Sequence, residues 1–457
     1  MKNNRFAIAF LLLLPFLGCK KDFLDKKPST NLNVPSSLND IQMLLDNVQE
    51  LNFSVGIGEL SADDFYMDYN SWINQFAPFY SNAYVWEKDV FAGQGEIADW
   101  NQPYKTVLTT NVALEQLNKI KRTDVNGKTY DELTAMALFL RSYMFFDLAQ
   151  VFALPYDENT ASKDYGIPVR LEADINKPTT RASLKATYDQ ILSDLIKAKN
   201  LIQTGYNSKL LNRPSKASIY GFLSRVFLNM RLYEKAGLYA DSALSFHNKL
   251  IDYNTLNTSA RLPFNINNDE MLFPCFLTSN NPIFSLFRSQ GYSIDTLLYK
   301  SYKSNDLRKR IFFSVNGSSI NRKGGYAGAR ISENSLATDE LYLTRAECYA
   351  RKGNNEGALE DLNSLLSKRF VTGTYVNITN LSGAALLKTI LEERRKELVN
   401  RGLRWNDIRR LNKGGDYFEL TRILNGKTYR LQPNDVKYVL PIPPDVISFT
   451  NIPQNNR

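Results

Sequence analysis

The sequence predicts a mostly α-helical protein built from tetratricopeptide-like helix repeats, with loop-rich insertions between them. Two observations carry this prediction: apolar residues recur at helical spacing in several long segments, and one helix–turn–helix pattern occurs twice, 122 residues apart. A third observation, the presence of long stretches without any periodicity, sets the insertions apart from the repeats.

Four helices are expected before the first clear repeat. Ser36 and Ser37 are suited to cap a helix that starts at Leu38. The periodicity then predicts helices over residues 96–120 and 129–152. Ser183 is expected to cap a further helix, because an apolar stripe at i, i+4, i+7 and i+8 spacing follows it: Leu184, Tyr188, Ile191, Leu192, Leu195 and Ile196.

The internal repeat joins residues 217–247 to residues 339–369. The two segments align through the pairs Tyr220/Tyr342, Ser224/Ala346, Phe227/Tyr349 and Ala236/Ala358. Small residues twelve apart with aromatic residues between them are typical of tetratricopeptide units, in which two helices cross closely and several pairs must stack. Residues 101–152 are a candidate for a degenerate third pair. The alternative is that these are unrelated antiparallel helix pairs.

We therefore expect helical repeats within about 96–250 and 336–410. The segments 53–95, 250–335 and 411–457 have little helical periodicity, and the last two contain many Asn, Ser and Gly residues. Ligand-binding residues are often found in insertions on a rigid scaffold, so we expect these three segments to carry the binding site.

The N-terminus has the pattern of a bacterial lipoprotein signal. Lys2 and Arg5 precede an apolar run of twelve residues, and Cys19 follows small residues at the expected cleavage point. We expect residues 1–18 to be removed, Cys19 to carry the lipid, and residues 19–35 to form a polar tether. A bilayer-spanning helix needs about 20 apolar residues, so acyl chains would be the only anchor. The alternative is an ordinary cleaved signal with a chance cysteine.

The composition excludes several classes of function. Without the leader the chain has 54 basic and 47 acidic residues, and no Lys/Arg stripe accompanies this modest excess, so no nucleic-acid partner is expected. The single histidine, His247, argues against His-based catalysis and His-ligated metals. Cys275 and Cys348 permit one disulfide bond at most. We expect no catalytic residue, no metal and no cofactor.

The segment 65–100 is the strongest candidate for a ligand site. It contains eleven aromatic residues, among them three of the four tryptophans. Flat aromatic faces suit the C–H face of a sugar ring, and the Tyr O–H and Trp N–H groups can hydrogen-bond to its hydroxyls. We expect ligand contacts from this group: Trp72, Tyr80, Tyr84 and Trp86. The alternative is that many of these rings lie on one core-facing side of a helix.

Two clusters of acidic residues need separate interpretations. Asp63, Asp64 and Asp68 offer oxygen ligands for calcium, but an acidic helix start explains them as well. Between residues 390 and 410, closely spaced carboxylates alternate with arginines, and a structural ion network is expected around Trp405 from Glu393, Arg394, Glu397, Arg404, Asp407 and Arg409. Arginine lowers the pKa of a neighbouring carboxyl group, which is the opposite of what a glycosidase acid needs.

The chain as a whole resembles the SusD/RagB family of outer-membrane nutrient-binding lipoproteins. The likeness starts at Cys19 and the polar residues that follow it, and includes the block Leu138–Phe152 with Pro155. It continues through further motifs in the family's order: Tyr165–Val169, Arg213–Ala217, Leu343–Glu347 with Gly353, Glu393–Arg410, Leu440–Pro443 and Ile452–Asn455.

The resemblance implies a SusD-like domain over residues 36–457 with about four tetratricopeptide-like pairs. It also implies a non-enzymatic protein on the outside of the outer membrane, where it captures an oligosaccharide and delivers it to a SusC-like TonB-dependent transporter. A peptide ligand within the same family is the first alternative, and a surface glycoside hydrolase is the second. Ligand residues have no fixed motif in this family, so the resemblance assigns none.

Overall fold

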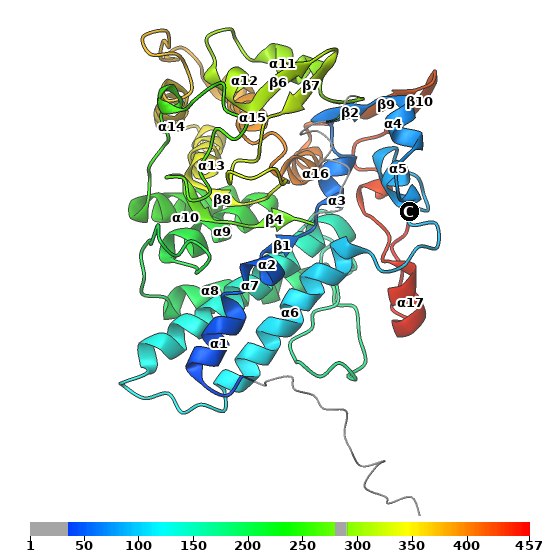
Figure 1. The fold of residues 1–457 in the computed structure, drawn as a ribbon, viewed down its shortest axis with the longest axis vertical. Coiled ribbons are helices and arrows are strands. Elements are labelled where there is room, and N and C mark those ends of the chain that lie inside the picture. The colour runs from blue at the N-terminus through cyan, green and yellow to red at the C-terminus, as the bar shows by residue number, and fades with distance from the viewer. Residues whose placement is uncertain (1–34, 279–288, 290) are drawn as a thin grey trace, which may run out of the picture.

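The computed structural model of the protein describes residues 35–278, 289 and 291–457 (Figure 1). The predictions for the signal peptide, Cys19 and most of the tether fall outside these residues. Long helices occupy one side and the lower part of the view in Figure 1, while short helices and hairpins occupy the upper and right-hand parts.

The long helices form a connected row in which each packs against the next. Its members in chain order are α6 (Ala98–Leu117), α7 (Gly127–Phe152), α8 (Leu184–Leu201), α9 (Lys216–Asn229), α10 (Tyr233–Phe246), α13 (Thr338–Arg351), α14 (Asn355–Ser367) and α15 (Gly383–Glu397). Helix α1 (Leu38–Leu45) packs on α6 and α7, and α16 (Arg404–Gly414) follows α15. The expected helices over 96–120 and 129–152 are thus present as α6 and α7.

Helix starts follow the capping residues in the sequence. The Ser37 side chain accepts a hydrogen bond from Asp40 N at the start of α1, and the Asp40 carboxylate accepts one from the Ser37 backbone N–H. Ser183 caps α8 in the predicted way, since its Oγ accepts from Ala186 N. These caps satisfy backbone N–H groups that have no partner within the helix.

The repeated segments fold as the helix pairs α9–α10 and α13–α14. Ser224 Oγ donates a hydrogen bond to Ala236 O at 2.8 Å, which joins the two helices of the first pair through the small residues that the repeat predicted. The pairs then meet through α10 and α13, where a Cβ on Gly237 would lie 3.0 Å from Cys348 Cβ. The absence of a side chain at Gly237 therefore permits this close approach.

Buried arginines also join the helices. Arg225 of α9 pairs with Glu340 of α13 at 2.6 Å and donates to the Tyr143 hydroxyl of α7 at 2.8 Å. Arg410 of α16 donates two hydrogen bonds to Glu347 of α13, at 2.7 and 2.8 Å. A buried charge that loses its partner is costly, so each pair favours one arrangement of the helices it joins.

The remaining elements are short. The segment before α6 contains α2 (Val48–Leu51), β1 (Phe53–Ser54), α3 (Ile57–Ser61), β2 (Phe65–Met67), α4 (Tyr69–Ile73) and α5 (Pro78–Tyr84). Between α10 and α13 lie η2 (Tyr253–Thr255), β3 (Met271–Phe273), β4 (Phe276–Leu277), β5 (Tyr292–Ile294), α11 (Thr296–Ser301), α12 (Leu307–Phe312), β6 (Phe313–Asn316), β7 (Ser319–Arg322) and β8 (Leu336–Ala337). After α16 come β9 (Leu420–Leu424), β10 (Lys427–Leu431), η4 (Val436–Tyr438) and α17 (Pro444–Thr450).

Strand pairing connects segments that are far apart in the sequence. Strand β1 pairs with β4 in parallel, β2 pairs with β5 antiparallel, and β3 pairs with β8 antiparallel. The β6–β7 and β9–β10 pairs are local hairpins. The first two insertions therefore form one body through β1–β4 and β2–β5.

Among the described residues, α7 is the one helix that is long and apolar enough to cross a membrane. All of its apolar window is buried inside the protein, and a core helix meets the same criteria. The helix packs against α6 and α8, and Arg141 near its centre pairs with Asp194 of α8 at 2.8 Å.

Candidate functional site

Three of the four aromatic residues nominated from the sequence lie in the core. Tyr80 is 2% exposed, and Tyr84 and Trp86 are each 1% exposed. The Tyr84 hydroxyl accepts a hydrogen bond from Met67 N at 3.0 Å, and Trp86 Nε1 donates to Ser61 O at 2.9 Å. These rings hold the segment together and offer no face to a ligand, which corrects the expectation that they contact one.

The burial of Tyr84 and Trp86 depends on the hairpin β9–β10. Arg422 of β9 lies over both rings, with its Cζ 4.4 Å from the centroid of Tyr84 and 5.0 Å from that of Trp86. The same guanidinium donates a hydrogen bond to Ala62 O. A segment more than 300 residues downstream therefore covers the aromatic segment.

Trp72 is the nominated residue that remains at the surface. Its indole is half-buried, and Nε1 donates to Ser81 O at 2.9 Å. The centroid of its ring lies 5.8 Å from that of Tyr69 and 6.1 Å from that of Tyr429 on β10. We call Tyr69, Trp72 and Tyr429 the aromatic surface.

Further exposed rings flank this surface on the same segment. Tyr66 is partly exposed and Phe76 is 73% exposed, although Phe76 packs on the buried Tyr80 ring at a centroid distance of 5.0 Å. Strand β2, α4 and the β9–β10 hairpin lie together at the upper right of Figure 1. One corner of the protein therefore presents several aromatic side chains to solvent.

The segment is not one helix. Phe65 and Met67 lie on strand β2, while Tyr69 and Trp72 lie on the short helix α4 and Phe79 lies on α5. Asp68 ends the strand and caps α4, since its Oδ1 accepts from Ser71 N at 2.7 Å. This break turns Tyr69 and Trp72 away from the core side that Phe65 and Phe79 occupy.

The acidic residues before β2 bind arginines. Asp63 accepts two hydrogen bonds from Arg404 of α16, at 2.6 and 3.0 Å, and Asp64 accepts one from Arg395 of α15 at 2.9 Å. Burial alone would raise the pKa of Asp63, but Arg404 and Arg395 outweigh it and hold this pKa well below its usual value. Within the described residues no group of His, Cys, Asp and Glu side chains is arranged to hold a metal ion. The Asp63 and Asp64 carboxylates are engaged by arginines instead.

The ion network predicted for residues 390–410 is present only in part, because among the described residues Arg394–Asp407 is the one ion pair that forms within the predicted set. Glu393 pairs with Arg308 at 2.7 Å, Glu397 pairs with Arg369 at 2.7 Å, and Arg394 pairs with Asp407 at 2.8 Å. Arg404 pairs with Asp63 outside the predicted set. The Arg409 guanidinium donates to the backbone carbonyls of Gln150 and Ala153 in place of a carboxylate.

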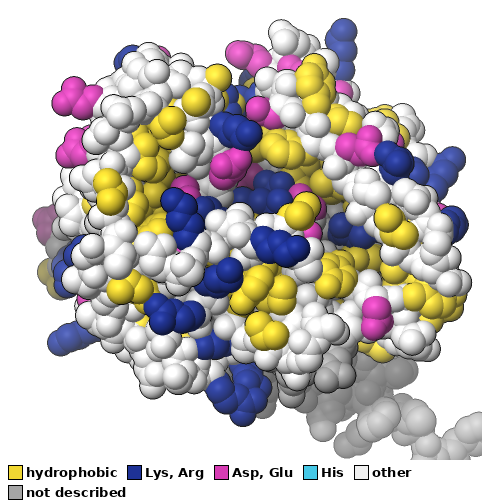
Figure 2. Space-filling model, turned by 90° about the horizontal axis from the view of Figure 1, so that it is seen from above, with side chains coloured by type: hydrophobic (Ala, Val, Ile, Leu, Met, Phe, Trp, Pro, Cys, Tyr) yellow, Lys and Arg dark blue, Asp and Glu magenta, His cyan; other side chains and the backbone are white. Residues whose placement is uncertain are grey.

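The upper face of the protein is hollowed. Lys and Arg side chains lie in and around the hollow, with some acidic residues and with hydrophobic side chains on its walls (Figure 2). A cavity of about 450 Å³ lies between α15, α16 and the segment leading to β9, and is lined in part by Leu387, Lys388, Arg395, Arg404 and Phe418. Arg395 and Arg404 at this cavity are already paired with Asp64 and Asp63.

The cysteines and the histidine have structural positions. Cys275 and Cys348 are both buried and unpaired, which answers the question of their pairing. His247 follows α10, its ring stacks on Tyr206 at a centroid distance of 3.7 Å, and Nε2 lies 2.6 Å from Asp269 O.

Comparison with known proteins gives the family. A family model described as starch-binding associating with outer membrane matches residues 22–228, and the model of the SusD family matches residues 338–455. The curated SusD-like protein P2 of Formosa agariphila is 23% identical over 436 residues, which cover 79% of this chain and 80% of that protein.

Solved structures agree in fold. A SusD superfamily protein from Bacteroides thetaiotaomicron has a TM-score of 0.74 at 20% identity and covers 92% of this chain and 100% of its own. A putative sugar binding protein from Bacteroides vulgatus has a TM-score of 0.71 at 22% identity, and surface glycan-binding protein A from Bacteroides fluxus has 0.69 at 18%. Each of these two covers 92% of this chain and 99% of its own.

The fold is thus that of the SusD-like helical proteins, as predicted. The two family models match separate parts of one chain in the family's order, and the chain belongs to the SusD/RagB family.

The sequence reasoning nominated neither Tyr69 nor Tyr429 of the aromatic surface, and the one farther from the nominated segment is Tyr429. It lies in a segment that was expected to be loop-rich, but Asn425–Gly426 between two alternating runs is a strong hairpin signal. Both residues have positive φ, 47° and 76°. That signal would have placed Tyr429 on a strand, although not beside Trp72.

Proposed function

We propose that this protein binds glycans at the cell surface and delivers them to a SusC-like TonB-dependent outer-membrane transporter. The support for carbohydrate as the ligand comes from the family and from two relatives that are described as glycan- or sugar-binding. The site we propose is the aromatic surface of Tyr69, Trp72 and Tyr429.

The single observation that supports this site is that the Trp72 ring contacts both the Tyr69 ring and the Tyr429 ring. Tyr69, Trp72 and Tyr429 come from two segments that are far apart in the sequence, yet their rings lie 5.8 and 6.1 Å apart at the surface. Aromatic rings that are partly open to solvent can pack against the C–H faces of successive sugar units. The Tyr429 and Tyr69 hydroxyls would add hydrogen bonds to the sugar hydroxyls.

We further propose that lipid on Cys19 anchors the protein on the outer face of the outer membrane. The tether of residues 20–35 would keep the binding domain beside its transporter at high effective concentration. Replacing Cys19 with Ala is expected to release the protein into the medium and to abolish uptake, while the purified variant still binds its ligand. Uptake that survives this change would contradict the proposed role of the anchor.

The proposed activity is binding without hydrolysis. The carboxylates at residues 393–407 are engaged by arginines, and Arg308 and Lys396 outweigh the effect of burial and hold the pKa of Glu393 below its usual value. A glycosidase needs a carboxyl group that keeps its proton near neutral pH, next to the scissile bond. The hydrolase alternative would need a different pair of carboxylates.

The test is affinity electrophoresis and calorimetry of the mature protein against a panel of polysaccharides, oligosaccharides and peptides. Retardation by at least one glycan, without release of reducing sugar, is the expected result. Binding to peptides alone would favour the peptide-uptake alternative within the family. Release of reducing sugar that disappears when one carboxylate is replaced would favour the hydrolase.

A further inference from the structure

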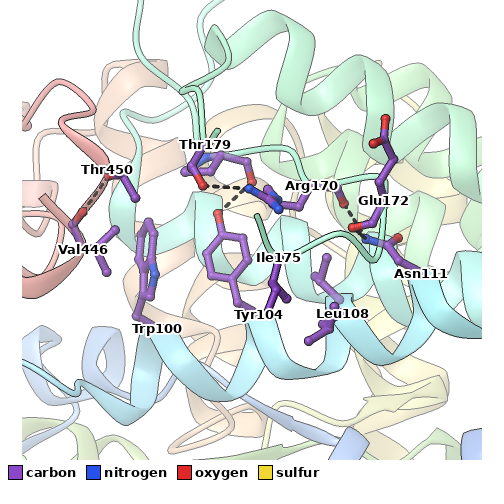
Figure 3. Close-up of a pocket in the computed structure, with 12 residues that line it drawn as sticks. Trp100, Tyr104, Leu108, Asn111, Arg170, Glu172, Ile175, Thr179, Val446 and Thr450 are labelled. Carbon is purple, nitrogen blue, oxygen red and sulfur yellow. Dashed lines mark hydrogen bonds between the residues drawn. The ribbon is translucent and has the colours of Figure 1, made fainter. Parts of the chain in front are cut away.

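A second cavity lies away from the aromatic surface. It has a volume of about 270 Å³, is open to solvent and is lined by α6, the loop of residues 168–179 and α17 (Figure 3). Pockets for drug-sized ligands measure roughly 300–1,000 Å³, so this one suits a single ring-sized group and not an oligomer.

The floor of the cavity is aromatic. Trp100, Tyr104 and Leu108 follow one another at i, i+4 and i+8 on one face of α6, and the centroids of the two aromatic rings are 4.9 Å apart. Val446 and Thr450 of α17 close one side. No acceptor for the Trp100 Nε1–H is found among residues 35–278, 289 and 291–457.

The opposite wall holds an arginine with only neutral partners. Arg170 donates from Nη1 to Lys177 O and Thr179 Oγ1, both at 2.8 Å, and from Nη2 to Asp174 O at 2.6 Å. Within the described part of the chain its Nε–H has no acceptor, and no carboxylate lies within ion-pairing distance. The positive charge is therefore fixed in place but not neutralised.

Figure 3 places this guanidinium over the hydroxyl end of Tyr104, with the Glu172 carboxylate pointing away from the cavity. Glu172 pairs instead with Lys177. Arg181 also acts on the Tyr104 hydroxyl electrostatically. Its own hydrogen-bond partners are neutral oxygens, those of Gly166, Phe152, Pro453 and Asn455. The aromatic floor therefore lies beside two arginines whose charge is not balanced by a carboxylate.

The wall is pre-organised. Asn111 of α6 donates to Arg170 O and Glu172 O at 3.0 and 3.2 Å, and Tyr104 Oη donates to Pro168 O at 2.8 Å. Asn111 is itself fixed, since its Oδ1 accepts from Arg141. A rigid site loses little conformational entropy when a ligand binds.

We propose that this cavity is a second carbohydrate site, which takes one sugar-acid ring with its carboxylate on Arg170 and its C–H face on Trp100 and Tyr104. An arginine whose charge is not neutralised favours an anionic group, and planar guanidinium groups match carboxylates in geometry. The choice of a sugar rests on the proposed function, while the location of the site does not. The acid can be free or can be the end unit of a glycan chain.

The test is calorimetric titration of the mature protein with galacturonate, trigalacturonate and glucose. Galacturonate is expected to bind at least ten-fold more tightly than glucose. Arg170→Gln removes the charge, and Leu108→Trp fills the cavity without touching the Arg170 hydrogen bonds. Each change is expected to weaken galacturonate binding at least ten-fold, while Trp72→Ala leaves it unchanged.

The outcomes separate this proposal from that for the aromatic surface. No binding of galacturonate at millimolar concentration, or equal binding of glucose, would overturn the second site. Galacturonate binding that is lost in Trp72→Ala but kept in both cavity variants would also overturn the second site. If both cavity variants abolish galacturonate binding, the two acids can be compared in the unchanged protein. Trigalacturonate that binds more tightly than galacturonate assigns the site to chain ends, and trigalacturonate that binds equally well assigns it to the free acid.

Discussion

Replacing Arg422 with Ala tests whether the C-terminal hairpin holds the aromatic segment in place. The guanidinium lies over Tyr84 and Trp86 and donates to the Ala62 carbonyl. Cation–π contacts contribute from ~0.5 to ~2 kcal/mol each, depending on how far they are desolvated. The hydrogen bond adds ~0.5–1.5 kcal/mol. We therefore expect the free energy of unfolding to fall by about 2–4 kcal/mol.

Urea unfolding followed by tryptophan fluorescence is a suitable assay, since three of the four tryptophans lie within residues 65–100. The matched control is Arg430→Ala on the same hairpin, where an exposed arginine pairs with Glu419 at 2.6 Å. Exposed ion pairs contribute about 0–1 kcal/mol, so this control should change little. A loss in Arg422→Ala below 1 kcal/mol, or one equal to that of the control, would refute the reasoning.

Three further predictions concern the stability of the protein and the reactivity of its cysteines. Burial beside Asp64 raises the pKa of Glu59 to about 8, so the folded protein holds a proton that the unfolded chain loses above about pH 4.5. The stability that Glu59 contributes is full below pH 4.5 and is lost as the pH rises towards 8, by up to about 1.4 kcal/mol per pH unit. Glu59→Gln should flatten this pH dependence of stability, as measured by urea titrations at several pH values. Burial raises the pKa of both Cys275 and Cys348. A thiol reagent should therefore label neither thiol in the native protein and both thiols after denaturation. Fast labelling of the native protein would contradict the buried positions of these cysteines. Ser37→Ala should lower stability by about 0.5–2 kcal/mol through loss of the α1 cap, measured against Ser36→Ala.

The helical scaffold was predictable because its signals are local. Ser37 and Ser183 mark helix starts through their own hydroxyls, and the apolar stripe after Ser183 repeats with the helical period. The repeat was visible because close helix crossings restrict side-chain size at fixed spacing, as at Ser224 and Ala236. Such constraints leave a pattern within a few turns of chain.

The site was less predictable because it depends on contacts between distant segments. Tyr84 and Trp86 resemble Trp72 in composition and neighbourhood, but Arg422 covers the first two while Tyr429 only flanks the third. Nothing near residue 80 in the sequence encodes the position of that hairpin. Asp63 and Asp64 likewise acquire their role only when α15 and α16 bring Arg395 and Arg404 to them.

The central claim is that glycan binds at the aromatic surface, and calorimetry on ring variants tests it most directly. With a glycan found in the panel, Trp72→Ala and Tyr429→Ala should each weaken binding at least ten-fold. Phe449→Ala is the control, because this side chain is 86% exposed on α17 and stands outside the surface. Unchanged affinity in both ring variants, or an equal loss in the Phe449 control, would contradict the account.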